Sequence, residues 1–155
     1  MSSRSMPNRS PDGGGTTQIR LAEFGFVALG GALGSAARFS ISTLIREQGD
    51  WPLSTLCVNL TGAFLLGVLL TAVATTGRGA SARLLLGTGV LGGFTTYSLL
   101  ATEVAQRLLA GNGWVALGYG ATTLVGGALL SGLGIALGRR LNRSSSSAPD
   151  AGGAR

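Results

Sequence analysis

Four apolar stretches joined by short polar connections dominate the pattern of hydrophobic and polar positions along the chain. Each is long enough for a helix to cross the hydrocarbon core of a bilayer. Short connections join helices that run antiparallel, so the pattern predicts an all-α integral membrane protein with four transmembrane helices. The predicted spans cover residues 24–44, 53–76, 84–109 and 114–138.

The two ends of the chain differ from this apolar middle. Residues 1–20 and 142–155 are rich in Ser, Pro and Gly, and they show no periodicity. Such segments bury too little apolar surface to offset the entropy lost on ordering. We therefore predict two disordered tails around a four-helix membrane domain over residues 21–141.

The third stretch is interrupted at its centre by residues 92–98, Gly-Gly-Phe-Thr-Thr-Tyr-Ser. Glycine and threonine weaken a helix, which can end here and begin again with Thr95 or Thr96 as its N-cap. We expect Gly92 to adopt a backbone conformation that favours glycine. A break at membrane depth frees carbonyl groups, and ion sites are often built this way. The pattern predicts a broken third helix, and a kinked helix packed through its glycines is the alternative.

Composition argues against an enzyme. Only 12% of residues are charged, mean hydropathy is +0.41, and histidine is absent. Histidine-ligated metals and histidine-based triads are therefore excluded. Of the six acidic residues only Glu103 lies within a predicted span, so no carboxylate pair is available for acid–base catalysis. The single Cys57 cannot form an internal disulfide.

The net charge of +6 comes from arginines that flank the apolar stretches, which favours a topological explanation over nucleic-acid binding. If both termini lie on one side, most of the arginines lie there too. Cytoplasmic segments carry such an excess, so both termini are predicted to be cytoplasmic. Near the spans, that side holds Arg20, Arg78, Arg83, Arg139, Arg140 and Arg143, and the opposite side holds Arg46 and Arg107.

Polar side chains inside the spans are the candidate functional groups, because they are costly in a bilayer. Thr55 and Asn59 share one helix face, as do Tyr119 and Thr123. A line of neutral donors suits a small anion, whose hydration shell must be replaced. For each threonine, a hydrogen bond to its own helix is the simpler alternative. An amide at mid-span, as at Asn59, needs partners.

Small residues recur at four-residue spacing and permit close approach of helices. They serve either packing within one subunit or dimerisation, and the sequence leaves both interpretations open. The pairs are Gly30 and Gly34, Ala63 and Gly67, and Gly134 and Gly138.

Three motifs follow one another along the spans. They are Gly-Gly-Ala-Leu-Gly-Ser-Ala-Ala-Arg-Phe at 30–39, Thr-Leu-Cys-Val-Asn-Leu-Thr-Gly at 55–62, and the stretch 92–98 with Glu103 beyond it. In this order and at this spacing the chain resembles the Fluc/CrcB family of fluoride channels over residues 24–138.

The resemblance implies an antiparallel dimer with two narrow fluoride pores, in the inner (plasma) membrane of a bacterium. It also implies a structural Na⁺ at the dimer centre, held by the carbonyl groups of Gly92 and Thr95 from both subunits. Arg38 matches the vestibule arginine, whose charge would attract anions. The fluoride path implied by the resemblance includes Asn59, Tyr97, Ser98, Leu100, Glu103, Tyr119 and Thr123.

Two positions depart from the family pattern. The family has phenylalanines where this chain has Tyr97 and Leu100. Aromatic ring edges are electropositive and can face an anion, and Leu100 has no ring. An antiparallel dimer of identical chains would require each chain to insert in both orientations, and the arginine bias opposes this. Together with the two changed aromatic positions, the bias leads us to expect an oppositely oriented paralogue as the dimer partner. The other expected contacts are fluoride and membrane lipid, without nucleic acid.

The sequence therefore predicts a subunit of a fluoride-specific channel that exports fluoride passively from the cytoplasm and lowers its toxicity. One alternative is a small multidrug-type transporter with four spans. That class uses a membrane-embedded carboxylate in its first span, whereas Glu23 only borders the first span here. The other alternative is a non-conducting assembly subunit of a membrane complex, which a flux measurement would separate from a channel.

Overall fold

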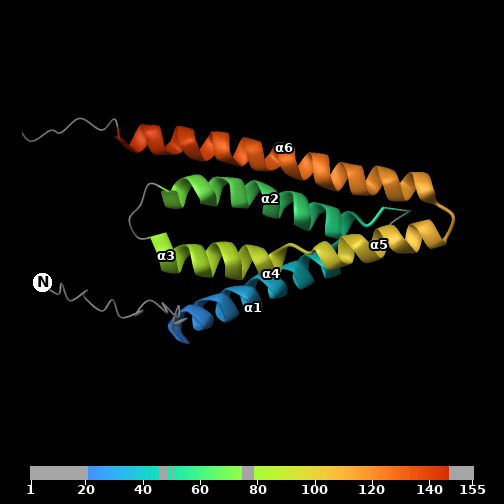
Figure 1. Cartoon of the computed structure of the whole chain (residues 1–155), viewed down its shortest axis with the longest axis horizontal. Helices are drawn as coiled ribbons and strands as arrows, with labels where there is room; N and C mark the ends of the chain where they lie inside the picture. Colours follow the sequence, from blue (N-terminus) through green and yellow to red (C-terminus); the bar gives the residue numbers. More distant parts are fainter. Residues whose placement is uncertain (1–20, 46–48, 50, 75–78, 147–155) are drawn as a thin grey trace, which may run out of the picture.

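The computed structural model describes residues 21–45, 49, 51–74 and 79–146, and the elements in these ranges are helical (Figure 1). The tails predicted at 1–20 and from residue 147 onward lie outside the described residues. In chain order the elements are α1 (Leu21–Leu44), α2 (Leu53–Ala74), α3 (Gly79–Ala82), the π-helix η1 (Arg83–Leu91), α4 (Gly92–Phe94), α5 (Tyr97–Leu109) and α6 (Gly113–Ser146).

The described chain contains four helical stretches that are long and apolar enough to cross a membrane, which confirms the predicted all-α class and its four spans. These stretches are Glu23–Leu44, Leu53–Ala72, Arg83–Leu109 and Gly113–Arg143. One boundary was wrong. Residues 142–146, which we assigned to the tail, continue α6 as helix. Asn142 supports this extension, because its Nδ2 donates to the carbonyl oxygen of Thr71 on α2 at 2.9 Å.

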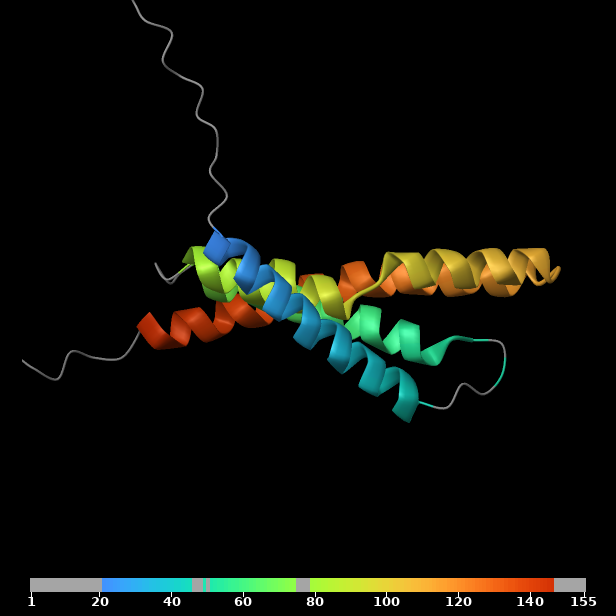
Figure 2. The ribbon, with the colours of Figure 1, turned by 90° about the horizontal axis from the view of Figure 1, so that it is seen from below.

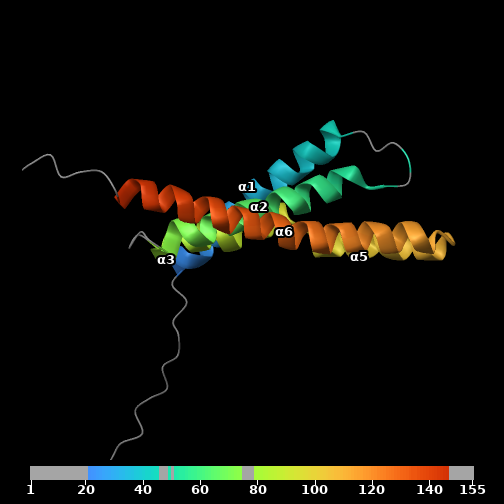
Figure 3. The same cartoon turned by 90° about the horizontal axis from the view of Figure 1, so that it is seen from above.

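Three contacts between helices define the bundle. α2 lies along α6, α1 crosses η1 and α4, and α5 packs against the first half of α6 (Figure 1). Toward the connection between α5 and α6, the end of α1 and the start of α2 diverge from the α5–α6 pair (Figures 2 and 3). We call this end of the bundle the α5–α6 end.

Small residues bring these helices into backbone contact within the subunit. A Cβ atom at Gly30, Gly34 or Gly93 would collide with a carbonyl oxygen across the α1 contact, namely that of Leu85, Val90 or Gly31. Gly67 and Gly134 meet the facing backbone in the same way between α2 and α6, and Gly138 meets the Thr71 hydroxyl. These glycines therefore serve packing within the chain, where dispersion replaces the hydrophobic drive missing in lipid.

The third span changes backbone conformation three times along its length. Its first part, η1, is π-helical, and α4 follows it as one short α-helical turn. Thr95 (φ −77°, ψ 158°) and Thr96 (φ −149°, ψ 113°) are extended, and α5 begins at Tyr97. Gly92 has ordinary helical angles (φ −64°, ψ −37°), so our expectation of a glycine-favouring backbone there was wrong.

Candidate functional site

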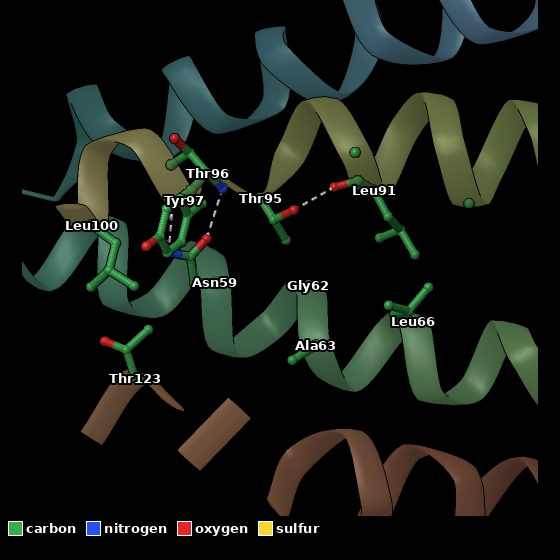
Figure 4. Close-up of a pocket in the computed structure, with 12 residues that line it drawn as sticks. Asn59, Gly62, Ala63, Leu66, Leu91, Thr95, Thr96, Tyr97, Leu100 and Thr123 are labelled. Atoms are coloured by element: carbon green, nitrogen blue, oxygen red, sulfur yellow. Dashed lines mark hydrogen bonds between the residues drawn. The ribbon is translucent and has the colours of Figure 1, made fainter. Parts of the chain in front are cut away.

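Asn59 on α2 pairs with the extended backbone of Thr96 through both ends of its side-chain amide (Figure 4). The Thr96 N–H donates to Asn59 Oδ1 at 2.8 Å, and Asn59 Nδ2 donates to the Thr96 carbonyl oxygen at 3.1 Å. The amide thus supplies an acceptor for the N–H of the extended Thr96 and adds a donor to its carbonyl oxygen. Since the amide nitrogen carries two N–H groups, one can still donate to another acceptor.

The side chains of the two threonines hold the ends of the flanking helices. Thr96 is the N-cap of α5, because its Oγ1 accepts from the Leu99 N–H at 3.3 Å, and it also lies 3.1 Å from the Ser98 hydroxyl. Thr95 Oγ1 instead donates back to the carbonyl oxygen of Leu91 at 2.9 Å. Of the two candidate caps in the sequence, the structure selects Thr96.

Because of these contacts, two carbonyl groups lack the N–H donor that each would have in a continuous helix. In a continuous α-helix the N–H of residue i+4 bonds to the C=O of residue i. The N–H of Thr96, the helical partner of the Gly92 carbonyl, donates to Asn59 instead. The N–H of Leu99, the helical partner of the Thr95 carbonyl, donates to the Thr96 hydroxyl. The interruption therefore frees the two carbonyl oxygens that we predicted as sodium ligands.

A cation at this position would depend on such backbone oxygens. In the part of the chain that the structure describes, no group of three or more His, Cys, Asp or Glu side chains could hold a metal ion. Neutral carbonyl oxygens suit a hard cation. Gly92 is exposed at the surface of the subunit, so its position is open to a group outside the chain.

A cavity of about 380 Å³ lies beside the interruption (Figure 4). It brings together six of the predicted site residues, namely Asn59, Gly92, Thr95, Tyr97, Leu100 and Thr123. The cavity is also lined by Thr96 and by five residues that we did not predict for the site, namely Gly62, Ala63, Leu66, Gly87 and Leu91. The α2 members could have been found from helical spacing, since Ala63 and Leu66 follow Asn59 on the same face.

The two departures from the family pattern line this cavity in different ways. The Tyr97 side chain is 80% exposed, whereas that of Leu100 is only 7% exposed.

Thr123 is buried, and its hydroxyl donates to the carbonyl oxygen of Tyr119 at 2.9 Å. The simpler interpretation of a hydrogen bond within the helix therefore holds for Thr123, as it does for Thr95.

A second polar group lies one helical turn further toward the α5–α6 end. The Glu103 carboxylate accepts at Oε1 from the Thr55 hydroxyl at 2.8 Å, and at Oε2 from the Tyr119 hydroxyl at 2.6 Å. Thr55 and Tyr119 are buried, and Trp51 packs edge-on to the Tyr119 ring with centroids 6.0 Å apart. Thr55 lies one helical turn before Asn59, and Tyr119 lies one turn before Thr123. The Glu103 group therefore continues the line of polar residues that begins in the cavity, and we call this line the polar track.

Arg38 lies apart from this track. It is half-buried on α1, and it is not among the residues that line the cavity. Arg107 lies at the α5–α6 end, where Nη1 donates to the Glu103 carbonyl oxygen at 2.9 Å. We predicted only a topological role for Arg107, although its position one turn after Glu103 on the same helix already places the two residues side by side.

Known proteins resemble this chain over most of its length. Residues 25–135 match the family described as "CrcB-like protein, Camphor Resistance (CrcB)". A Moorella thermoacetica protein named "Fluoride-specific ion channel FluC 2" is 44% identical over 111 residues, covering 70% of this chain and 90% of that protein. Proteins of Cutibacterium acnes ("Fluoride-specific ion channel FluC 1") and Thermus thermophilus ("Fluoride-specific ion channel FluC") are each 43% identical over 117 residues. The first alignment covers 72% of this chain and 82% of that protein, and the second covers 74% and 94%. The chain therefore belongs to the CrcB family.

Proposed function

We propose that this chain is a subunit of a fluoride-specific ion channel that exports fluoride passively from the cytoplasm and thereby lowers its toxicity. The observation that carries the proposal is the amide of Asn59 set against the extended Thr96 beside a cavity. The relatives' names support fluoride as the ion. Passive export also agrees with the sequence, which has no nucleotide-binding loop of the Walker type.

The proposed fluoride path follows the polar track from the cavity to the α5–α6 end. Fluoride would accept a hydrogen bond from the second N–H of the Asn59 side-chain amide, at a position beside Tyr97, Ser98 and Leu100. It would then accept hydrogen bonds from the hydroxyl groups of Thr55 and Tyr119, which now donate to the Glu103 carboxylate. Each step replaces lost hydration with a neutral donor, which limits the cost of burying an anion. Thr123 would contribute once its hydroxyl turns from the Tyr119 carbonyl, and Arg38 would attract anions to the vestibule.

An antiparallel dimer with Na⁺ at its centre is the proposed assembly. One subunit offers two freed carbonyl groups, those of Gly92 and Thr95, and two subunits would offer four. The exposed Tyr97 side chain and the exposed Gly92 lie on the open side of the cavity, where a second subunit would complete its wall.

Replacement of Gly92 by valine tests this assembly. Among the described residues, a Cβ atom at Gly92 would meet only the Gly87 carbonyl oxygen at 3.9 Å, so the fold should survive. A neighbouring subunit at the freed carbonyls would be pushed away. We expect Gly92→Val to raise the Na⁺ concentration needed for half-maximal dimer at least about tenfold, measured by cross-linking in detergent. The control is Gly132→Val, at an exposed helical glycine with no atom nearby. An unchanged Na⁺ dependence in Gly92→Val would count against the central cation.

The distribution of arginines along the bundle supports our proposal of a plasma-membrane protein with cytoplasmic termini. Arg83 begins the third span, and Arg139, Arg140 and Arg143 lie near the end of α6. Figure 1 places these two segments at the same end of the bundle, opposite the α5–α6 end. Such a biased chain inserts in one direction, so its antiparallel partner would be an oppositely oriented paralogue.

Growth of fluoride-sensitive bacteria tests both the ion and the partner. We expect this chain alone to give no rescue, and co-expression with an oppositely oriented paralogue to restore growth in fluoride. Efflux from vesicles containing the pair, read with a fluoride electrode, checks that rescue reflects transport. Rescue by this chain alone would refute the heterodimer and keep the channel. Assembly of the pair without any fluoride efflux would refute the channel and favour a non-conducting subunit.

A further inference from the structure

Arg107 lies at the α5–α6 end of the bundle, where it contacts the backbone of Glu103 and the ring of Tyr119. Its Nη1 donates to the carbonyl oxygen of Glu103 at 2.9 Å, and its guanidinium carbon lies 5.6 Å from the centre of the Tyr119 ring. The hydroxyl of the same ring donates to the Glu103 carboxylate at 2.6 Å. One half-buried cation thus contacts both the backbone of the residue that carries the single carboxylate of the track and the ring whose hydroxyl binds that carboxylate.

Membrane topology does not account for an arginine at this position. Arg107 lies at the end of the bundle opposite to Arg83, Arg139, Arg140 and Arg143, so it reduces the charge bias that orients the chain. A cation in the last turn of a helix stabilises the helix dipole, and this is the plainest alternative role. That role requires no contact with an aromatic ring on another helix, whereas Arg107 faces Tyr119 on α6.

We propose that Arg107 offsets the negative charge of Glu103 and so sets the rate at which fluoride passes the Thr55–Tyr119 hydroxyl pair. An uncompensated carboxylate would repel fluoride from these donors, and a guanidinium group nearby reduces this repulsion. A cation over the ring face also draws electron density from the ring, which strengthens the Tyr119 hydroxyl as a donor. Arg107 acts on fluoride through Glu103 and Tyr119, as a positioning and electrostatic residue. This inference rests on the fluoride path proposed above.

The test compares Arg107→Gln and Arg107→Lys with the wild-type dimer in oriented vesicles, by fluoride efflux. Ionic strength is varied with impermeant salts on the side of the α5–α6 end, at constant Na⁺. We expect Arg107→Gln to lower efflux about tenfold at low ionic strength. The difference should shrink to about twofold near 1 M, where the Debye length is about 3 Å. Lysine should restore most of the efflux, and the control Arg139→Gln, which removes an exposed arginine at the other end, should match wild type.

Two outcomes overturn the proposal. The first is Arg107→Gln efflux equal to wild type. The second is a loss that is the same at every ionic strength and is not restored by lysine, which would indicate a purely structural role. If the glutamine variant does not assemble, Arg107→Lys still decides, because it keeps the positive charge: an assembled lysine variant with efflux about tenfold below wild type would overturn the proposal. A wild-type dimer that releases no fluoride at any ionic strength would overturn the proposed function instead.

Discussion

Asn59→Asp is expected to reduce fluoride efflux at least about 100-fold while the chain still inserts in the membrane. Asparagine both accepts from and donates to Thr96, whereas a carboxylate can only accept. The Thr96 carbonyl oxygen would lose its donor and face a negative oxygen. Fluoride would meet a like charge beside the cavity, and two unit charges about 4 Å apart repel by roughly 4 kcal/mol at an effective dielectric constant of about 20. Efflux from vesicles with a fluoride electrode measures the effect.

Asn142→Asp is the matched control for this substitution. Asn142 also donates its amide to a backbone carbonyl on α2, that of Thr71 at 2.9 Å, but it lies at the far end of α6. The same chemical change there should alter efflux by less than about threefold, since it adds no charge to the proposed path. Equal efflux in Asn59→Asp and wild type, from folded protein in both cases, would remove Asn59 from the path.

Gly93→Val is expected to destabilise the subunit by roughly 3 kcal/mol or more, because overpacking at a rigid contact forces the backbone to move. A Cβ atom at Gly93 would collide with the carbonyl oxygen of Gly31 and would also lie 3.0 Å from its Cα. Both are backbone atoms, so no side chain can turn aside. Thermal unfolding in detergent measures the loss, and the yield of monodisperse protein supports it.

Gly132→Val serves again as the comparison, because a Cβ atom added at this exposed position of α6 would meet no other part of the described chain within 4 Å. Its midpoint temperature should stay close to that of the wild type. If Gly93→Val unfolds at the same temperature as Gly132→Val, α1 does not approach the third span as closely as the structure indicates.

Much of the architecture could be predicted because it depends on local sequence. Membrane spans follow from the length and polarity of each stretch, and the residues that can cap a helix are few. The position of Thr96 at the start of α5 was therefore within reach of the sequence. The end of α6 was not, because serine-rich composition suggested a tail where the helix continues to Ser146.

The contacts of the site could not be predicted, since they depend on the register between helices. Nothing in the order of residues says that Asn59 reaches the backbone of Thr96, or that Thr55 and Tyr119 meet at one carboxylate. The conformation of Gly92 was wrong for a related reason. We assumed that glycine was needed for its dihedral angles, whereas that backbone is ordinary and the tight contact belongs to its neighbour Gly93.

The unequal lengths of α2 and α6 determine how this subunit responds to bilayer thickness. At 1.5 Å per residue, the 34 residues of α6 extend about 51 Å and the 22 residues of α2 about 33 Å. Of these two helices, only α2 is close in length to the hydrocarbon core of a bilayer, which is roughly 30 Å thick. Trp114, 87% exposed at the start of α6, is suited to anchor that end at the interface, which leaves the surplus length at the arginine end. Hydrophobic mismatch would then be absorbed by immersing more or less of the arginine end of α6, while Asn59 and Glu103 stay at a fixed depth below the opposite interface.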